Sequence, residues 1–394
     1  MSINTKSIKS IKSIKTENKD GETYMKESTL NEMIDMKDYG FNAFYDKAWF
    51  KLYESEWHIE SPVMPARVIS DHGQKVRIIT PFGEKLANRP AHGQEMTQHL
   101  AAGDWISVHM INNETEASIE HVLPRMTKFS RAAAGVAVKE QIVAANIDTI
   151  FLIQSLNKDF NMRRLERYLI AAWESGAVPV IVLTKSDLCE DIEERIQKVE
   201  ETAPGVEIHA VSNLTGEGIE SLRKYVSVGK TIALLGSSGV GKSTLVNTLT
   251  GSYVLKTQEI REDDSKGRHT TTHRELVLLP GGGLILDTPG MRTLSLWEAE
   301  EGMEKMFGDI ESLIKTCRFN DCKHQKEPGC AVREAIRKGA IDESKWQSWL
   351  KLQKEIRHLE SKKNSKIRAI EKLGIKKISR QINARTRQSE GYDM

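Results

Sequence analysis

The sequence predicts an α/β protein built on a doubly wound parallel sheet, with a small β-barrel before it and a helical region after it. Three observations lead to this fold class. From residue 140, buried strand patterns alternate with helical patterns. Residues 60–125 contain only short strand patterns and turns, and beyond residue 298 the pattern is helical around one cysteine-rich loop.

Short strands separated by turns characterise residues 60–125. A strand pattern at 76–80 is followed by a Pro81-Phe82-Gly83 turn, and Gly103-Asp104 precedes another strand at 105–108. Several short strands in so short a segment favour a small barrel such as an OB-fold. The pattern alone does not separate an OB-fold from an SH3-like barrel.

The alternating region supplies the parallel sheet. Helical patterns at 163–174 and 192–202 separate the first strands, as βαβ units require. Ligands of such a sheet bind at the carboxyl ends of its strands. The predicted strands cover residues 149–153, 178–183, 207–211, 231–235 and 284–286.

A complete G-x-x-x-x-G-K-S phosphate loop follows the strand at 231–235 and opens a helix. Its glycines let backbone N–H groups surround phosphates, and the helix N-terminus favours their negative charge. Lys242 is expected to reach the β- and γ-phosphates, and the Ser243 hydroxyl to bind magnesium. The predicted phosphate-binding residues are Gly236, Ser237, Ser238, Gly239, Val240, Gly241, Lys242, Ser243 and Thr244.

A T-K-x-D motif, formed by Thr184, Lys185, Ser186 and Asp187, ends another predicted strand. The Asp187 carboxylate can accept hydrogen bonds from both N1–H and N2–H of guanine, a pair of donors that adenine lacks. The Lys185 stem can pack on the base. Thr184 stands where Asn is usual, which affects affinity more than base preference. Ser212 and Asn213, after a further strand, are expected to contact the base oxygen through their backbone.

The order of these motifs is unusual. An ordinary GTPase has its phosphate loop first and its guanine motif near the end, whereas here Asp187 precedes Lys242. The order predicts a circularly permuted GTPase. An ATPase of similar build is a weaker alternative, because Asp187 reads guanine.

The remaining catalytic elements are expected between residues 267 and 291. Asp287 and Gly290 form a D-x-x-G that holds magnesium through its coordination shell and contacts the γ-phosphate. Thr271, with Thr270 as its competitor, is expected to complete the magnesium shell. Met291 occupies the position of the usual water-orienting Gln, so hydrolysis should be slow or use another group. His269 is one candidate and a partner's residue is another.

Three cysteines and one histidine lie close together after residue 315, with spacing suited to a closed tetrahedral zinc site of structural role. The predicted ligands are Cys317, Cys322, His324 and Cys330. Three buried free thiols are the alternative. Cys189 stands apart from this set.

Composition excludes several classes of protein. No apolar run reaches the length of a membrane span, no secretory signal is visible, and the four cysteines do not form a disulfide scaffold, so a cytoplasmic location is expected. The net charge of +2 conceals a basic segment, since residues 351–388 hold thirteen Lys or Arg against three Asp or Glu. This segment suits a polyanionic partner, or a solvated charged helix. Residues 6–15 repeat Lys-Ser-Ile and are expected to be disordered.

Together, these motifs resemble the RsgA (YjeQ) family of GTPases that depend on the small ribosomal subunit. The resemblance covers residues 60–385 and includes four further motifs: Gly103-Asp104-Trp105, Leu123-Pro124-Arg125, Ala144-Ala145-Asn146-Ile147-Asp148 and Glu327-Pro328-Gly329-Cys330. It implies an OB-fold, a permuted GTPase domain and a zinc domain, and an enzyme that acts late in small-subunit maturation and is stimulated by that subunit. It also implies GTP or GDP, magnesium and one structural zinc as ligands, and rRNA as a partner.

The expected domains are a disordered extension at 1–45, an RNA-binding barrel at 46–130, the GTPase domain at 131–297, and the zinc domain with its basic tail at 298–394. The chain is expected to be a monomer. In the main hypothesis, GTP hydrolysis releases the enzyme from the subunit. The alternative is a nucleotide-gated RNA or ribosome binder whose hydrolysis is incidental.

Overall fold

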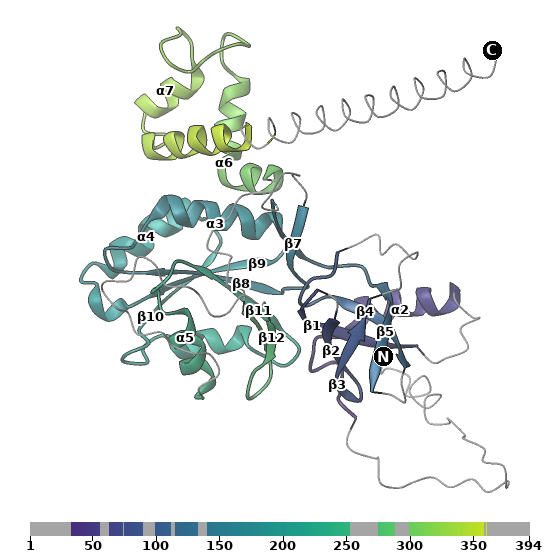
Figure 1. The fold of residues 1–394 in the computed structure, drawn as a ribbon. Helices are drawn as coiled ribbons and strands as arrows, with labels where there is room; N and C mark the ends of the chain where they lie inside the picture. Colours follow the sequence, from purple (N-terminus) through teal and green to yellow (C-terminus); the bar gives the residue numbers. More distant parts are fainter. Residues whose placement is uncertain are drawn as a thin grey trace, which may run out of the picture.

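The computed structural model describes residues 33–55, 63–73, 75–89, 99–111, 115–132, 140–252, 275–287, 299–357 and 360. The chain forms a barrel, a six-stranded sheet with helices on both faces, and a helical C-terminal part that lies beyond α3 (Figure 1). Within the described ranges, no helix is both long and apolar enough to cross a bilayer.

Five strands close the barrel in the order β1-β2-β3-β5-β4, with β4 paired to β1. All pairs are antiparallel except β3 with β5. This five-stranded Greek-key connection is that of an OB-fold, so the topology decides what the strand pattern left open. The strands are β1 (Val63–Asp71), β2 (Lys75–Thr80), β3 (Gly83–Asn88), β4 (Trp105–Ile111) and β5 (Glu116–Val122).

The segment before the barrel packs against it. Met36 and Tyr45 are 7% and 2% exposed and join a cluster around the fully buried Trp105 at the start of β4. Tyr45 belongs to helix α2 (Ala43–Ser55), so the boundary expected at residue 45 falls inside a helix. Residues 1–32 lie outside the described part of the chain.

The motifs at the end of the barrel meet at its junction with the sheet. The buried Asp104 carboxylate accepts two hydrogen bonds from Arg125, at 2.6 and 2.7 Å. Gly103 has φ +90°, and a Cβ there would lie 2.2 Å from the Ala145 carbonyl oxygen, so only glycine fits. The Asn146 side chain donates to the Gly103 carbonyl. These residues fix how the barrel sits on the sheet.

A two-stranded ribbon connects the barrel to the sheet. β6 (Lys128–Ala132) pairs with β7 (Glu140–Ala145), and the chain then enters β8. The barrel also reaches the far edge of the sheet, where Arg77 on β2 pairs with Glu275 on β12 at 2.6 Å.

The sheet has the order β10-β9-β8-β11-β13-β12, with only β12 antiparallel to its neighbour. From the centre of the sheet, β8, β9 and β10 follow one another toward one edge. The chain then returns to the centre as β11, and β12 and β13 form the other half of the sheet. Connecting the strands as β11, β12, β13, β8, β9, β10 would restore the ordinary order of motifs, which confirms circular permutation. The strands are β8 (Thr149–Ser155), β9 (Val178–Thr184), β10 (Glu207–Val211), β11 (Thr231–Gly236), β12 (Glu275–Leu278) and β13 (Leu284–Asp287).

Helices cover both faces of the sheet, as a doubly wound fold requires (Figure 1). Ile150 and Leu152 of β8 pack with α3 (Met162–Glu174) and α4 (Ile192–Thr202). Phe151 and Ile153 point to the other face and pack with α5 (Lys242–Thr250) and the 3-10 helix η3 (Ile219–Tyr225). Both predicted helices are present, and α4 has the predicted bounds.

The C-terminal part is built on α6 (Glu300–Lys315), α7 (Ala331–Arg337) and a further helix at 343–357. α6 packs along α3 at Gly302, where a Cβ would lie 2.6 Å from the Ile170 carbonyl oxygen. The Gly302 N–H donates to Glu174 at the end of α3. One continuous core therefore runs from the α3 face of the sheet into this part.

Candidate functional site

The phosphate loop lies at the centre of the sheet, between the last residue of β11 and the first of α5. On one side of β11 lies β8 and on the other β13, and the chain leaves β8 and β11 toward opposite edges. This is the switch point at which doubly wound sheets bind their ligands. Gly236 is held so close to β8 that a Cβ would lie 2.6 Å from the Ile153 carbonyl oxygen, and Gly241 has φ +96°.

Lys242 is directed back along its own loop. Its ammonium group donates to the carbonyl oxygens of Gly236, at 2.8 Å, and Ser237, at 2.5 Å. These two bonds use two of its three N–H donors and fix the charge over the loop. A cation held in this way, at the N-terminus of α5, suits a phosphate chain.

The guanine motif is connected directly to the phosphate loop. The Thr184 hydroxyl, fully buried at the end of β9, lies 2.6 Å from the Val240 carbonyl oxygen and donates to it. The threonine in place of the usual asparagine therefore still has a donor that ties the two motifs together. The Asn213 amide adds a second connection by donating to the Gly241 carbonyl at 3.3 Å.

The carboxylate of Asp187 is oriented by the next loop. Ser212, buried at the end of β10, donates its hydroxyl to Asp187 Oδ1 and accepts from the N–H groups of Leu214 and Thr215. Lys185 has φ +60°, an uncommon conformation for a residue with a Cβ, and such outliers concentrate at functional sites. Ser186 begins the 3-10 turn η2 (Ser186–Leu188), which holds Asp187.

A charged pair next to the phosphate loop was missed by the sequence reasoning. Arg164, on α3, and Asp159, in the loop before it, both bond to the Ser237 hydroxyl. The Arg164 guanidinium holds the pKa of Asp159 below its ordinary value, and Asp159 in turn raises the pKa of Arg164. Nothing in the local sequence indicates the pair, because its meaning depends on a contact across 73 positions.

Several predicted residues lie outside the described part of the chain. These are His269, Thr270, Thr271, Gly290 and Met291. Asp287 is described in its backbone, where it is the last residue of β13, the strand beside β11. Their roles in magnesium binding and hydrolysis stay predictions.

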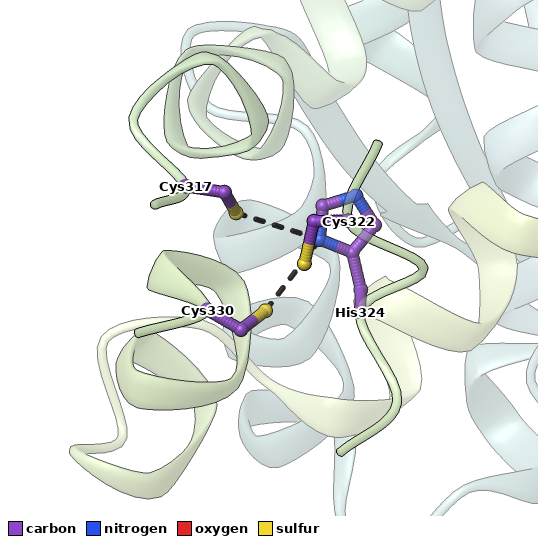
Figure 2. Close-up of side chains that lie close together, drawn as sticks. All are labelled: Cys317, Cys322, His324 and Cys330. Atoms are coloured by element: carbon purple, nitrogen blue, oxygen red, sulfur yellow. Dashed lines mark hydrogen bonds between the residues drawn. The ribbon is translucent and has the colours of Figure 1, made fainter. Parts of the chain in front are cut away.

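The cysteines and histidine of the C-terminal part meet around one point (Figure 2). The ligand atoms of Cys317, Cys322, His324 and Cys330 all lie within 4.8 Å of one another. His324 Nδ1 is 3.6 Å from Cys317 Sγ and 3.5 Å from Cys330 Sγ. Tetrahedral zinc with ordinary bond lengths sets sulfur and nitrogen about 3.5 Å apart, so the donor set fits a closed metal site.

The surroundings of this cluster hold its loop in shape. The Glu327 carboxylate accepts hydrogen bonds from the backbone N–H groups of Lys323, Gln325 and Lys326. His324 packs edge-on against the buried Trp346, with ring centroids 5.5 Å apart. Burial lowers the pKa of His324, which favours the neutral imidazole that binds metals.

Comparison with known proteins agrees with this geometry. A family profile described as RsgA GTPase matches residues 122–297. A curated protein of Listeria monocytogenes, named Small ribosomal subunit biogenesis GTPase RsgA 2, is 42% identical over 84% of this chain and 91% of its own length. The chain belongs to the RsgA family of GTPases. A protein of Oceanobacillus iheyensis, named Small ribosomal subunit biogenesis GTPase RsgA 1, is 45% identical over 71% of this chain and 80% of its own length.

Solved structures share this fold. The crystal structure of YjeQ from Thermotoga maritima matches with a TM-score of 0.56 and 27% identity, over 74% of this chain and 97% of that chain. YloQ, described as a circularly permuted GTPase, matches in fold with a TM-score of 0.52, at 23% identity and over 76% and 97% of the two chains. A second family profile, described as ABC transporter, matches residues 219–389, which include the phosphate loop that many nucleotide-binding proteins share.

Proposed function

We propose that the chain hydrolyses GTP to GDP and phosphate during the late maturation of the small ribosomal subunit, and that hydrolysis releases it from that subunit. The central observation is the bond from the Thr184 hydroxyl to the Val240 carbonyl, which joins a guanine motif to a phosphate loop. The site therefore suits one guanine nucleotide. The names of the RsgA relatives supply the small-subunit context.

Each motif takes a defined role in this proposal. Asp187, oriented by Ser212, accepts from the guanine base, with Lys185 packed on the ring and Asn213 beside the base oxygen. The phosphate loop and Lys242 bind the phosphates, and Ser243, Thr271 and Asp287 complete the magnesium site. The main-chain and side-chain contacts to phosphate come from Gly236, Ser237, Ser238, Gly239, Val240, Gly241, Lys242, Ser243, Thr244 and Gly290.

Hydrolysis needs a group that orients water, since Met291 has no polar atom for this task. His269 in the preceding loop, or a residue of the bound subunit, takes that role in the proposal. If the bound subunit supplies this group, GTP hydrolysis would be slow for the free enzyme and fast for the enzyme on the subunit.

Small ribosomal subunits and their rRNA are the proposed partners, with a cytoplasmic location and a monomeric chain. The basic segment at 351–388 and the OB-fold barrel suit a polyanion. The metal of the cysteine cluster is proposed to be one structural zinc. Hydrolysis would act on the C-terminal part through the segment after Gly290, which leads directly into α6. Cutting that segment near residue 297 should separate release from hydrolysis.

The first experiment is GTP hydrolysis by the purified protein, with and without small ribosomal subunits. Large stimulation by the subunit, with GTP and not ATP, is the expected result. Lys242→Ala should lose nucleotide binding and serves as the negative control. Binding of the subunit in a GTP-dependent manner, without stimulated hydrolysis, would instead establish the nucleotide-gated binder and overturn the enzymatic proposal.

A further inference from the structure

The loop between β8 and α3 closes a ring of hydrogen bonds on the phosphate loop. Arg164 forms a two-point pair with Asp159, at 2.8 and 3.0 Å, and its Nη1 also donates to Ser237 Oγ at 2.6 Å. The Ser237 hydroxyl in turn donates to Asp159 Oδ2 at 2.6 Å. The hydroxyl thus gives its one proton to a carboxylate and accepts from a guanidinium, and both bonds are charge-assisted.

The charged pair is itself held by a buried side chain. Gln154 at the end of β8 is 1% exposed and makes two hydrogen bonds, each 2.9 Å, with the backbone of Asn161. The Asn161 side chain caps α3 by accepting from the Arg164 N–H at 3.1 Å. Asp159 is fixed on its other side, because its N–H donates to Asn157 at 3.0 Å. The pair is therefore pre-organised by the sheet.

The same serine carries one of the two carbonyls that hold Lys242. The Ser237 carbonyl accepts from the Lys242 ammonium at 2.5 Å, while the Ser237 side chain is locked by Arg164 and Asp159. A shift of Ser237 would therefore displace one of the two carbonyls that hold the ammonium group. Displacements of about 1 Å at such a group can lower a rate by about a hundredfold.

We propose that Arg164 and Asp159 are positioning residues for GTP hydrolysis, which fix Ser237 and through it Lys242. The inference rests on the proposed function of the phosphate loop and adds two residues that lie outside its motif. Base selectivity should not depend on them, because Asp187 is held by Ser212 in a separate set of contacts. Lysine at position 164 would keep the charge but could not reproduce the planar contact with both Asp159 and Ser237.

The test is a mutant cycle on the full-length protein with saturating small ribosomal subunits. Arg164→Met and Ser237→Ala should each lower kcat for GTP by about tenfold to a hundredfold. The double variant should be no slower than the slower single variant, because both changes break one ring. Arg164→Lys should lie between the wild type and Arg164→Met. Preference for GTP over ATP should stay unchanged in all of them.

Arg163→Met is the matched control, because Arg163 is the exposed neighbour on the same helix. It should leave kcat unchanged, and thermal unfolding should show that each variant folds. Additive losses in the double variant, an unchanged kcat in Ser237→Ala, or an equal loss in Arg163→Met would overturn the inference. Ser237→Ala removes a single hydroxyl, so it keeps the test decisive if Arg164→Met does not fold.

A second readout separates this inference from the proposed function. The dissociation rate of a fluorescent GDP analogue is measured for the same variants by stopped flow. If the wild type does not hydrolyse GTP with subunits, the proposed function fails. Faster and non-additive GDP release in Arg164→Met and Ser237→Ala would still support loop positioning, whereas unchanged release would refute it.

Discussion

At the scale of single residues, the chain depends on short side chains that connect segments far apart in sequence. Thr184 and Val240 are 56 positions apart, and Ser212 and Asp187 are 25 apart. Each contact gives a hydrogen-bond partner to a donor or acceptor that would otherwise be buried and unpaired. Loss of one partner leaves the other buried and unpaired, which costs about 1–3 kcal/mol.

The first prediction concerns Thr184. Thr184→Val keeps the shape but removes the donor to Val240, so affinity for GTP and GDP should fall by about tenfold. Preference for guanine should persist because Asp187 is intact. Titration with a fluorescent GDP analogue measures the change. Thr184→Ser, which keeps the hydroxyl, should bind nearly as the wild type does, and an equal loss in both variants would show that the hydroxyl is not what matters.

Arg67 is a buried cation whose guanidinium binds backbone carbonyl oxygens. Its guanidinium donates to the carbonyls of Tyr39, Gly103 and Asn146, so it joins the N-terminal segment, the barrel and the junction with the sheet. Burial lowers the pKa of Arg67 to about 10, so it remains charged at neutral pH. Its ring contact with Trp105, at 5.5 Å, adds a cation–π interaction.

The second prediction follows from those contacts. Arg67→Met removes a donor from three carbonyls, of which Gly103 keeps its bond from Asn146, and should lower stability by about 3 kcal/mol or more. Thermal unfolding should show a midpoint several degrees lower. Arg223→Met is the control, since that side chain is 54% exposed and its replacement should change stability by less than about 0.5 kcal/mol. Equal midpoints for the two variants would contradict the assignment.

At the scale of elements, helix α3 contacts three parts of the molecule: the phosphate loop, the sheet and α6. Its first turn carries Arg164 beside the phosphate loop, its inner face packs on β8 and β9, and its last turns receive α6. Arg167, on the same helix, pairs with Glu355 of the helix at 343–357. One helix, α3, therefore contacts both the phosphate loop and the C-terminal part of the chain.

The third prediction tests the contact between α3 and α6. In Gly302→Ala the new methyl group would lie 2.6 Å from the Ile170 carbonyl oxygen, which should destabilise the packing by about 1–3 kcal/mol. Limited proteolysis in the segment between β13 and α6 should become faster. Gly308→Ala, which directly follows the kink at Phe307 in α6, meets no atom within 4 Å and should change stability by less than about 0.5 kcal/mol. If both variants resist proteolysis as the wild type does, the close contact between Gly302 and Ile170 does not stabilise the packing of α6 on α3.

At the scale of the whole molecule, the barrel and the C-terminal part are joined to the sheet in different ways, one through polar contacts and the other through apolar packing. The barrel is joined to the sheet through buried hydrogen bonds around Gly103 and Asn146, and through the Arg77–Glu275 pair at the edge strand. The C-terminal part is joined through apolar packing, since Cys330 and Trp346 belong to the same core as the α3 face of the sheet. β12 directly follows the segment that carries Thr271, so the barrel contacts an element next to the predicted switch.

The fourth prediction concerns the metal. Purified protein should contain one zinc per chain by elemental mass spectrometry, and Cys322→Ser should lose it. Three remaining ligands hold zinc poorly, so the loop at 317–330 should open and the unfolding midpoint should fall. Nucleotide affinity should change little, because the phosphate loop packs in the other core. Cys189→Ser, outside the cluster, should keep its zinc; metal loss in both variants would exclude the four-ligand site.

Much of the molecule follows from local pattern. The predicted strands and helices between 149 and 286, the phosphate loop, the guanine motif and the Cys-His spacing have short-range signatures, and these signatures indicate the permuted GTPase class. The edge strand β12 was not predicted. The pattern of residues 60–125 predicted short strands but not their connection, because strand order depends on pairing between distant segments. The parallel contact of β3 with β5 and the closure of β4 on β1 decided the OB-fold.

The sequence by itself determined which chemistry the chain carries, since phosphate loops, guanine motifs and metal ligands are read from residue type and spacing. Only the tertiary structure decided how that chemistry is held. It showed that Thr184 bonds to Val240, that Arg125 bonds to Asp104, and that the Asp159–Arg164 pair bonds to Ser237. The physical reason is that a hydrogen bond depends on distance in space, and folding brings together groups whose separation along the chain has no local signature.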